Sequence, residues 1–294
     1  MVRIMKNDVF SFNRFSRYLA TDIRNAVSNY GITILVMATL GLSIDVFTGL
    51  FSMIVSDGWH GMGIVSRSVL FMIAFLVILI SAPSKLFGHV TDRKEGSAFL
   101  TLPVSTLEKT ISMVLVACVL VPAAFVIVYF SIDLIVCCCD PTCGESLISA
   151  VATIKVEILD KLGEAMAELS AVMQNPEALV SPLLYVDDFI QISLLFLLGA
   201  LVFKKSKIAK TIGCLILISM VLSMIATPLM MVGIKDEMEQ LVMNNELTPF
   251  NFPEHFPLIT WICQHLALSD TVSDTVMNLL LMFFIWLRIK KINH

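Results

Sequence analysis

Charged residues are scarce in this chain of 294 residues, because Asp, Glu, Lys and Arg together make up only 15% of it. Hydrophobic residues make up 57%, and the mean hydropathy is +0.87. A soluble core of this chain length cannot enclose so much apolar surface, whereas a chain surrounded by lipid does not have to. The sequence also lacks basic stretches interleaved with aromatic residues, so no nucleic-acid partner is expected.

Motifs that carry catalysis are missing as well. The chain contains no G-x-x-x-x-G-K-[ST] segment and therefore cannot form a P-loop of its own. It has no G-x-S-x-G elbow and no H-E-x-x-H pair, and its five histidines are scattered rather than clustered with carboxylates. We therefore expect no enzyme activity, no resident cofactor and no metal site on this chain.

Six long apolar runs are present, and each is close to the roughly 20 residues that a helix needs to cross the hydrocarbon layer. They cover residues 32–55, 64–82, 111–136, 183–203, 208–232 and 272–289. The apolar residues in these runs are continuous rather than alternating, which favours helices over strands. The sequence thus predicts an all-α, polytopic helical membrane protein that forms a single transmembrane domain over residues 1–294.

The placement of basic residues predicts the orientation. Most of the 20 Lys and Arg residues precede the first run, follow the last, or lie between the second and third or the fourth and fifth runs. Lysine and arginine accumulate in the cytoplasmic segments of membrane proteins. We therefore expect six transmembrane helices with the N and C termini in the cytoplasm, in the plasma or inner membrane of the cell.

Two aspartates, Asp45 and Asp133, lie within apolar runs. An intramembrane pair of carboxylates can indicate an aspartyl protease or a proton relay. At about 1.5 Å per residue, however, both lie far along their helices, toward the outer face, where Asp187, Asp188 and Asp274 are also expected. We interpret them as a partly hydrated outer acidic belt, and we keep Asp45 as a candidate for contact with a substrate or a cation.

Four of the seven cysteines, Cys137, Cys138, Cys139 and Cys143, follow the third run closely. Adjacent cysteines cannot easily converge on one metal ion, and no histidine lies nearby to complete a set of ligands. Two interpretations stay open: a disulfide near the outer surface, or unligated thiols at the end of a span. Unligated thiols are the simpler of the two.

Two amphipathic segments are expected outside the spans. Residues 10–30 have helical spacing and predict an interfacial helix in the cytoplasmic headgroup layer. Its apolar side would consist of Phe12, Phe15, Leu19, Ile23 and Val27. The outer insertion at residues 137–181 repeats apolar residues at steps of three and four from Leu147 to Val172, which predicts an outer amphipathic helix that ends at Asn175-Pro176.

The segment between the second and third runs, residues 83–110, is predicted to be a cytoplasmic loop. Proline at 103 disfavours helix before it, and Ser105 to Glu108 form the capping-box pattern S-x-x-E, which starts the third helix. A charged turn that ends at Gly96 precedes the apolar residues 98–100. This surface suits a soluble partner, although a loop that folds back on its own bundle would have the same pattern.

At this loop the chain resembles the permease subunits of type-two ABC exporters, in their short bacterial form. The resemblance rests on Arg93-Lys94-Glu95-Gly96, Phe99-Leu100 and Leu102-Pro103-Val104-Ser105. The six-span layout and the amphipathic N-terminal segment are similar to that family as well. The cysteine cluster and the outer insertion depart from its pattern.

The resemblance implies that Arg93, Lys94, Glu95 and Gly96 form a coupling loop that contacts a separate cytoplasmic ABC ATPase subunit, which would bind and hydrolyse ATP. It also implies a second permease copy or a paralogue, because six spans are too few to enclose a pathway in this class. The chain would then be the membrane permease subunit of an ATP-driven exporter. The alternatives are a non-transporting membrane sensor or assembly protein and, less favoured, an integral membrane enzyme.

Overall fold

The computed structural model describes residues 10–55, 58–91, 96, 104–140, 142–144, 146–149, 182–243 and 266–292. Every regular element in these ranges is helical. They are α1 (Phe12–Val55), α2 (Ile64–Phe87), the 3₁₀ turn η1 (Gly88–Thr91), α4 (Thr106–Val114), the π-helical segment η2 (Leu115–Leu120), α5 (Val121–Cys139), α7 (Pro182–Val202), α8 (Lys207–Met243) and α11 (Leu266–Ile292).

Four stretches among the described residues are long and apolar enough to cross a membrane: Phe12–Val55, Ile64–Thr91, Thr106–Cys139 and Lys207–Ile225. The prediction of an all-α membrane protein is therefore confirmed. Helices also occupy the fourth and sixth predicted spans, as α7 and α11. That these two cross the membrane, and that the spans number six, stay predictions.

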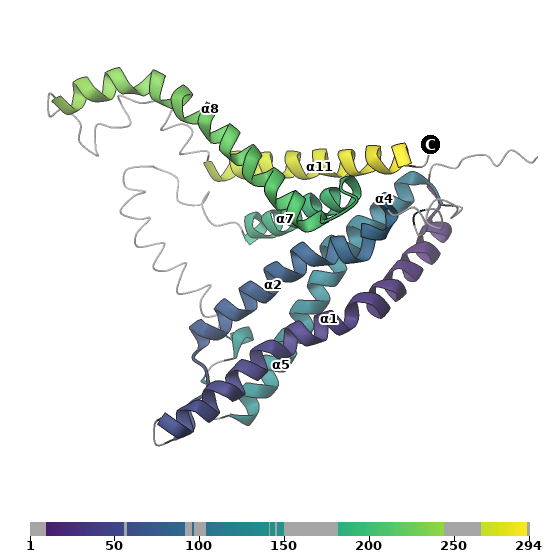
Figure 1. The fold of residues 1–294 in the computed structure, drawn as a ribbon, viewed down its shortest axis with the longest axis vertical. Helices are drawn as coiled ribbons and strands as arrows, with labels where there is room; N and C mark the ends of the chain where they lie inside the picture. Colours follow the sequence, from purple (N-terminus) through teal and green to yellow (C-terminus); the bar gives the residue numbers. More distant parts are fainter. Residues whose placement is uncertain are drawn as a thin grey trace, which may run out of the picture.

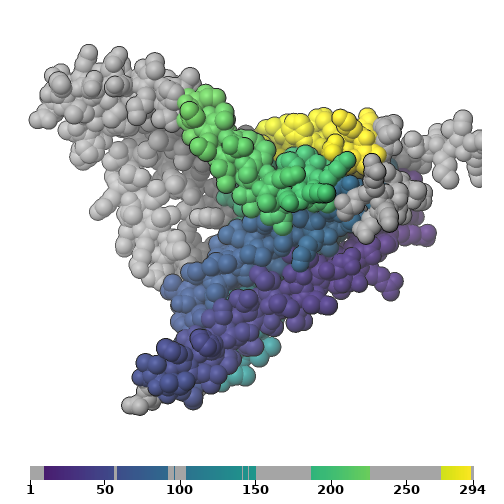
Figure 2. Space-filling view, in the orientation of Figure 1, coloured from purple at the N-terminus to yellow at the C-terminus, as the bar shows by residue number. Residues whose placement is uncertain are grey.

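The helices form a layered bundle with one outlying member (Figure 1). α2 packs against α1, α5 and α7, and α7 also packs against α11 and α8. The buried core between them includes Tyr30, Ile78, Phe125, Leu197 and Ile285, all completely inaccessible to solvent. α8 leaves the bundle beyond its contact with α7, as the space-filling view in Figure 2 shows. Many large apolar side chains on α1 and α8 are exposed, which suits helices whose solvent is lipid.

The N-terminal amphipathic segment and the first span form one helix. α1 runs without a break from Phe12 to Val55, so the predicted helix is confirmed but its separation from the span is wrong. Its 44 residues amount to roughly 66 Å, about twice the hydrocarbon thickness. The structure therefore shows no change of direction that would separate an interfacial helix from the span, and the placement of the N-terminal part in the headgroup layer stays a prediction.

The packed face of the N-terminal part of α1 also differs from the prediction. Phe15, Tyr18, Ala26 and Tyr30 are the buried positions, whereas Phe12, Ile23 and Val27 of the predicted apolar side are exposed. The side of α1 that packs against other helices is therefore not the side with the most apolar residues. Contacts with the neighbouring helices, and not hydrophobicity alone, determine which side is buried.

Pro83 was expected to begin a loop, but it lies inside α2, which continues to Phe87 before η1. A proline in a helix removes one backbone hydrogen bond and usually kinks or ends the helix. Here Pro83, Leu86 and Phe87 are all buried against the rest of the bundle. This packing favours continuation of the helix and shortens the predicted loop from its N-terminal side.

The predicted capping box is confirmed. The Ser105 side chain accepts a hydrogen bond from the Glu108 backbone N–H at 3.2 Å, and the Glu108 carboxylate accepts one from the Ser105 N–H at 2.9 Å. The helix begins at Thr106, five residues before the predicted span, and continues through η2 into α5. The π-helical turn precedes Pro122, which has no N–H to donate to the turn before it.

The α7–α8 hairpin depends on a glycine. A methyl group at Gly199 of α7 would lie 2.0 Å from Oγ1 of Thr211 on α8. We expect Gly199→Ala to destabilise the protein by about 1–3 kcal/mol, as overpacking typically does. Gly213→Ala is the matched control, because nothing lies within 4 Å of a methyl there. Thermal unfolding in detergent measures both, and equal melting temperatures would contradict the close packing.

The predicted outer helix cannot be compared with the structure over most of its length. Residues 150–181 lie outside the described part of the chain, and only a first helical turn at 147–149 is seen.

Candidate functional site

The described helices come close together at one end of the bundle and spread apart toward the other, where α7, α8 and α11 diverge from α1, α2 and α5 (Figure 1). At one end, here called the Asp45 end, α1 and α5 finish and α2 begins. Contacts there join Asp45 to Met62, Trp59 to Asp140 and Arg67 to Asp133. At the opposite end, the Glu108 end, contacts join Arg14 to Glu108, Lys207 to the Gly88 carbonyl and Arg288 to the Leu201 carbonyl.

Basic residues of the described helices gather at the Glu108 end. They lie within the first four turns of α1, on the first turns of α4 and α8 and on the last turns of α2 and α11. Among the basic side chains that the structure describes, Arg67, on the first turn of α2, is the exception. Basic residues that lie in separate segments of the sequence therefore come together at one end of the bundle.

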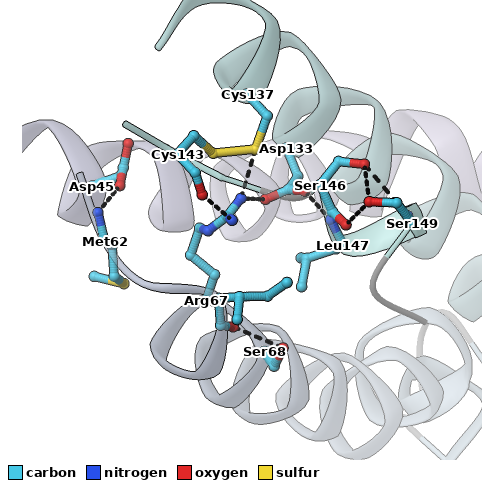
Figure 3. Close-up of polar contacts among 11 residues, drawn as sticks. Asp45, Met62, Arg67, Ser68, Asp133, Cys137, Cys143, Ser146, Leu147 and Ser149 are labelled. Carbon is cyan, nitrogen blue, oxygen red and sulfur yellow. Dashed lines mark hydrogen bonds and ion pairs between the residues drawn. A yellow bond between two sulfur atoms is a disulfide. The ribbon is translucent and has the colours of Figure 1, made fainter. Parts of the chain in front are cut away.

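Arg67 and Asp133 form a buried ion pair at the Asp45 end (Figure 3). They are 4% and 6% exposed, and Nη1 of Arg67 donates to Oδ1 of Asp133 at 2.7 Å. Nη2 of Arg67 donates to the Cys143 carbonyl at 3.0 Å, and the Leu147 N–H donates to Oδ2 of Asp133 at 2.6 Å. The pair thus fastens α2, α5 and the segment after α5 together.

This pair corrects the interpretation of Asp133 as part of a hydrated acidic belt. The carboxylate is buried, and a guanidinium neutralises it. Of the other predicted members, Asp45 is also buried, Asp187 and Asp274 are half-buried, and Asp188 is exposed. The signal that sequence reasoning passed over is Arg67 itself, a basic residue in the first turn of a helix that is otherwise almost wholly apolar.

A disulfide between Cys137 and Cys143 closes the turn that follows α5. Figure 3 shows it beside the ion pair, with Nη1 of Arg67 2.8 Å from the Cys137 sulfur. Unligated thiols, the favoured interpretation, are therefore wrong for these two residues, whereas Cys138 and Cys139 are free and exposed. The closed turn brings the Cys143 carbonyl within hydrogen-bonding distance of Arg67 and the Leu147 N–H within hydrogen-bonding distance of Asp133.

Asp45, the candidate contact residue on α1, is 4% exposed, and its Oδ1 accepts a hydrogen bond of 2.6 Å from the Met62 N–H. With Arg67, Tyr129 and Asp133 it lines a cavity of about 20 Å³, enough for a single water molecule. It also lines a more open hollow of about 400 Å³ between α1 and α5. Asp45 therefore lies where a bound molecule would reach it.

Trp59 and Asp140 also line this hollow. Trp59 Nε1 donates to Oδ2 of Asp140 at 2.7 Å, and the Thr142 N–H donates to Oδ1 at 2.8 Å. The bond from Trp59, followed by those from Thr142, lowers the pKa of the Asp140 carboxyl, so it is ionised at neutral pH. Gly49 provides room for the indole, because a methyl there would lie 2.5 Å from the Trp59 ring.

At the Glu108 end a single carboxylate caps two helices. Glu108 is completely buried, and besides Ser105 it accepts hydrogen bonds from the Ser11 N–H at 2.7 Å and from Nε and Nη2 of Arg14, both at 2.8 Å. The bidentate pair joins the first turn of α1 to that of α4. The capping pattern predicts the bond to Ser105, but the sequence gives no signal for Arg14 as a partner.

The predicted coupling loop follows η1 at this same end. Arg93, Lys94 and Glu95 lie outside the described residues. Gly96 is buried, and a methyl there would lie 2.5 Å from the Val90 carbonyl oxygen, so only glycine lets the chain approach the end of η1 so closely. The part of the predicted loop that can be described thus packs on its own bundle, and its role in coupling stays a prediction.

No protein-family model, curated protein or solved structure matches this chain. The fold and the two ends define its class directly. It is an all-helical membrane protein with a buried ion pair and a two-carboxylate hollow at one end, and a carboxylate that joins two helix starts at the other.

Proposed function

We propose that this chain is the membrane permease subunit of an ATP-driven exporter, with six spans and both termini in the cytoplasm of a cell whose plasma or inner membrane it crosses. A separate cytoplasmic ABC ATPase would bind the loop around Arg93–Gly96. The observation that carries the proposal is the accumulation of basic residues at the Glu108 end, where this loop begins.

Charge asymmetry supplies the orientation. Segments rich in lysine and arginine stay on the cytoplasmic side of a membrane. The Glu108 end then faces the cytoplasm, and the loop after η1 lies on the side that contains ATP. The Asp45 end, with its disulfide, faces the exterior or periplasm, where disulfides persist.

The structure offers rigid elements through which a partner at the loop would act. α2 and η1 form an unbroken helical stretch from Ile64 at the Asp45 end to Thr91, where the loop begins. The loop leads into α4, whose Glu108 holds the first turn of α1. Displacement of the loop would therefore act on both α2 and the α1–α4 junction.

A second permease copy or a paralogue completes the proposal. In α8, residues from Ile216 to Ile225 are nearly all exposed, and the helix stands away from the rest of the bundle. Lipid or a second subunit must cover such a surface in the membrane.

The test reverses the loop charges and measures the associated ATPase. We expect Arg93→Glu with Lys94→Glu to reduce, at least tenfold, the recovery of an ATPase subunit with the full-length chain from native membranes. Lys204→Glu with Lys205→Glu is the matched control, because these exposed lysines carry the same charge at the same end.

Equal recovery with both double variants would contradict the coupling loop. Failure to recover any ATPase with the unaltered chain would contradict the permease assignment and favour the sensor or assembly protein.

A further inference from the structure

The hollow between α1 and α5 combines an apolar wall with two carboxylates. Its lining consists of Leu42, Asp45, Val46, Trp59, Ile135, Val136, Cys139 and Asp140. Leu42, Val46 and Ile135 are at least 38% exposed, so the hollow opens onto the lipid-facing surface near one end of the bundle. Its volume of about 400 Å³ suits a small organic molecule.

The salt bridges of the described residues pair Arg67 with Asp133 and Arg14 with Glu108, and they involve neither Asp45 nor Asp140. Within the described part of the chain, Asp45 accepts from the Met62 N–H, and Asp140 accepts from Trp59 and Thr142, which are all neutral donors. Arg67 affects Asp140 by its charge without forming a salt bridge with it. A carboxylate as buried as Asp45 carries a large desolvation cost that a bound cation would offset.

The two carboxylates also lie close to each other. A methyl placed on Gly61 would lie 2.8 Å from Oδ2 of Asp140 and 3.4 Å from Oδ1 of Asp45. Both acids therefore lie beside Gly61, and both line the hollow together with the Trp59 indole. Aromatic rings and carboxylates together are the groups that recognise organic ammonium ions.

We propose that this hollow binds an amphiphile with a net positive charge, whose ammonium head lies between Asp45 and Asp140 beside Trp59. Its alkyl chain lies along Leu42, Val46 and Ile135 toward the lipid. The proposal that the hollow binds such a molecule depends only on the contacts described above. A role of the hollow as the entry or exit site for a transported substrate rests on the proposed function.

Calorimetry with a defined probe tests the site. Octylammonium, whose primary head donates N–H bonds to carboxylates, is titrated into the purified full-length chain in the uncharged detergent dodecyl maltoside, with detergent-only titrations subtracted. We expect saturable binding that Asp45→Asn weakens at least tenfold, because the charge attraction is lost while the amide oxygen still accepts the Met62 N–H. Asp188→Asn removes an exposed carboxylate elsewhere and should leave the affinity unchanged.

A second pair of variants tests the head-group position without altering charge. Gly61→Ala places a methyl 2.8 Å from Oδ2 of Asp140, which displaces that carboxylate, and it should also weaken binding at least tenfold. Gly63→Ala is its control, because a methyl at Gly63 has no neighbour within 4 Å. Melting temperatures of all four variants verify that each one folds.

Three results would overturn the proposal: unchanged affinity in Asp45→Asn, equal binding of uncharged nonan-1-ol, or equal binding of lysophosphatidylcholine, whose phosphate the carboxylates should repel. The ATPase takes no part in this measurement. If the unaltered chain does not bind the probe but recovers the ATPase, the binding site alone is rejected. If it binds the probe but recovers no ATPase, the exporter function alone is rejected.

Discussion

Arg67→Met is expected to lower the free energy of unfolding by about 3–5 kcal/mol, the usual cost of removing one partner of a buried ion pair. The variant leaves the Asp133 carboxylate buried with one backbone donor, the Leu147 N–H, and removes the donor that holds the Cys143 carbonyl. Denaturant titration in mixed micelles, followed by circular dichroism, measures the loss.

The double variant Arg67→Met with Asp133→Leu separates the ion pair from the packing around it. Replacing both buried charges by apolar groups of similar size often restores stability, because neither charge then needs to be desolvated. We expect recovery of most of the loss. Arg24→Met, at an exposed position on α1, is the control and should change little. Equal losses in the single and double variants would show that the pair does not determine stability.

The helices could be predicted because each depends on local sequence. The apolar runs locate α2, α5, α7, α8 and α11, and the S-x-x-E pattern locates the start of α4 within one residue. These signals act over one turn or one helix, so they need no knowledge of the neighbours.

The errors concern features that neighbouring helices decide. The break near residue 30 and the stop at Pro83 were both inferred from local composition, but packing against other helices continues α1 and α2 through these positions. Lipid outside the bundle and protein inside it are both apolar environments, so hydropathy alone cannot say which face of α1 packs. The exposed Val27 and the buried Ala26 illustrate this.

The contacts at the two ends of the bundle could not be predicted for a different reason, because they join residues that are far apart in the sequence. Arg67 and Asp133 are 66 residues apart, and Arg14 and Glu108 are 94 apart, so no local pattern links them. Among the four clustered cysteines, the pairing of Cys137 with Cys143 depends on how the chain turns back after α5. Asp45 was predicted to belong to a partly hydrated acidic belt, but it is buried, and its contact with a substrate or a cation stays a prediction. The second carboxylate of the hollow, Asp140, comes from another element.

Glu108→Ala is expected to cause the second largest loss, about 2–3 kcal/mol, because it removes the cap of α4 and the charge-assisted bonds from Arg14 together. The ion-pair share is limited, since the Arg14 side chain is 37% exposed and water partly screens it. The first turn of α1 would lose its attachment to α4. Limited trypsin digestion, which cleaves after Arg14 and Arg17, reports this release directly.

Two milder variants divide the effect of Glu108. Ser105→Ala removes only one bond of the capping box, and we expect about 1 kcal/mol of destabilisation without faster cleavage in α1. The Ser11 and Ser105 N–H groups donate to different oxygens of the Glu108 carboxylate, so Glu108→Gln keeps an acceptor for only one of them. It also loses the charge that holds Arg14, so its cleavage rate should lie between those of Ser105→Ala and Glu108→Ala. If all three variants were cleaved as slowly as the unaltered chain, the α1–α4 junction would not depend on Glu108, and displacement of the loop after η1 would have no route to α1 through this residue.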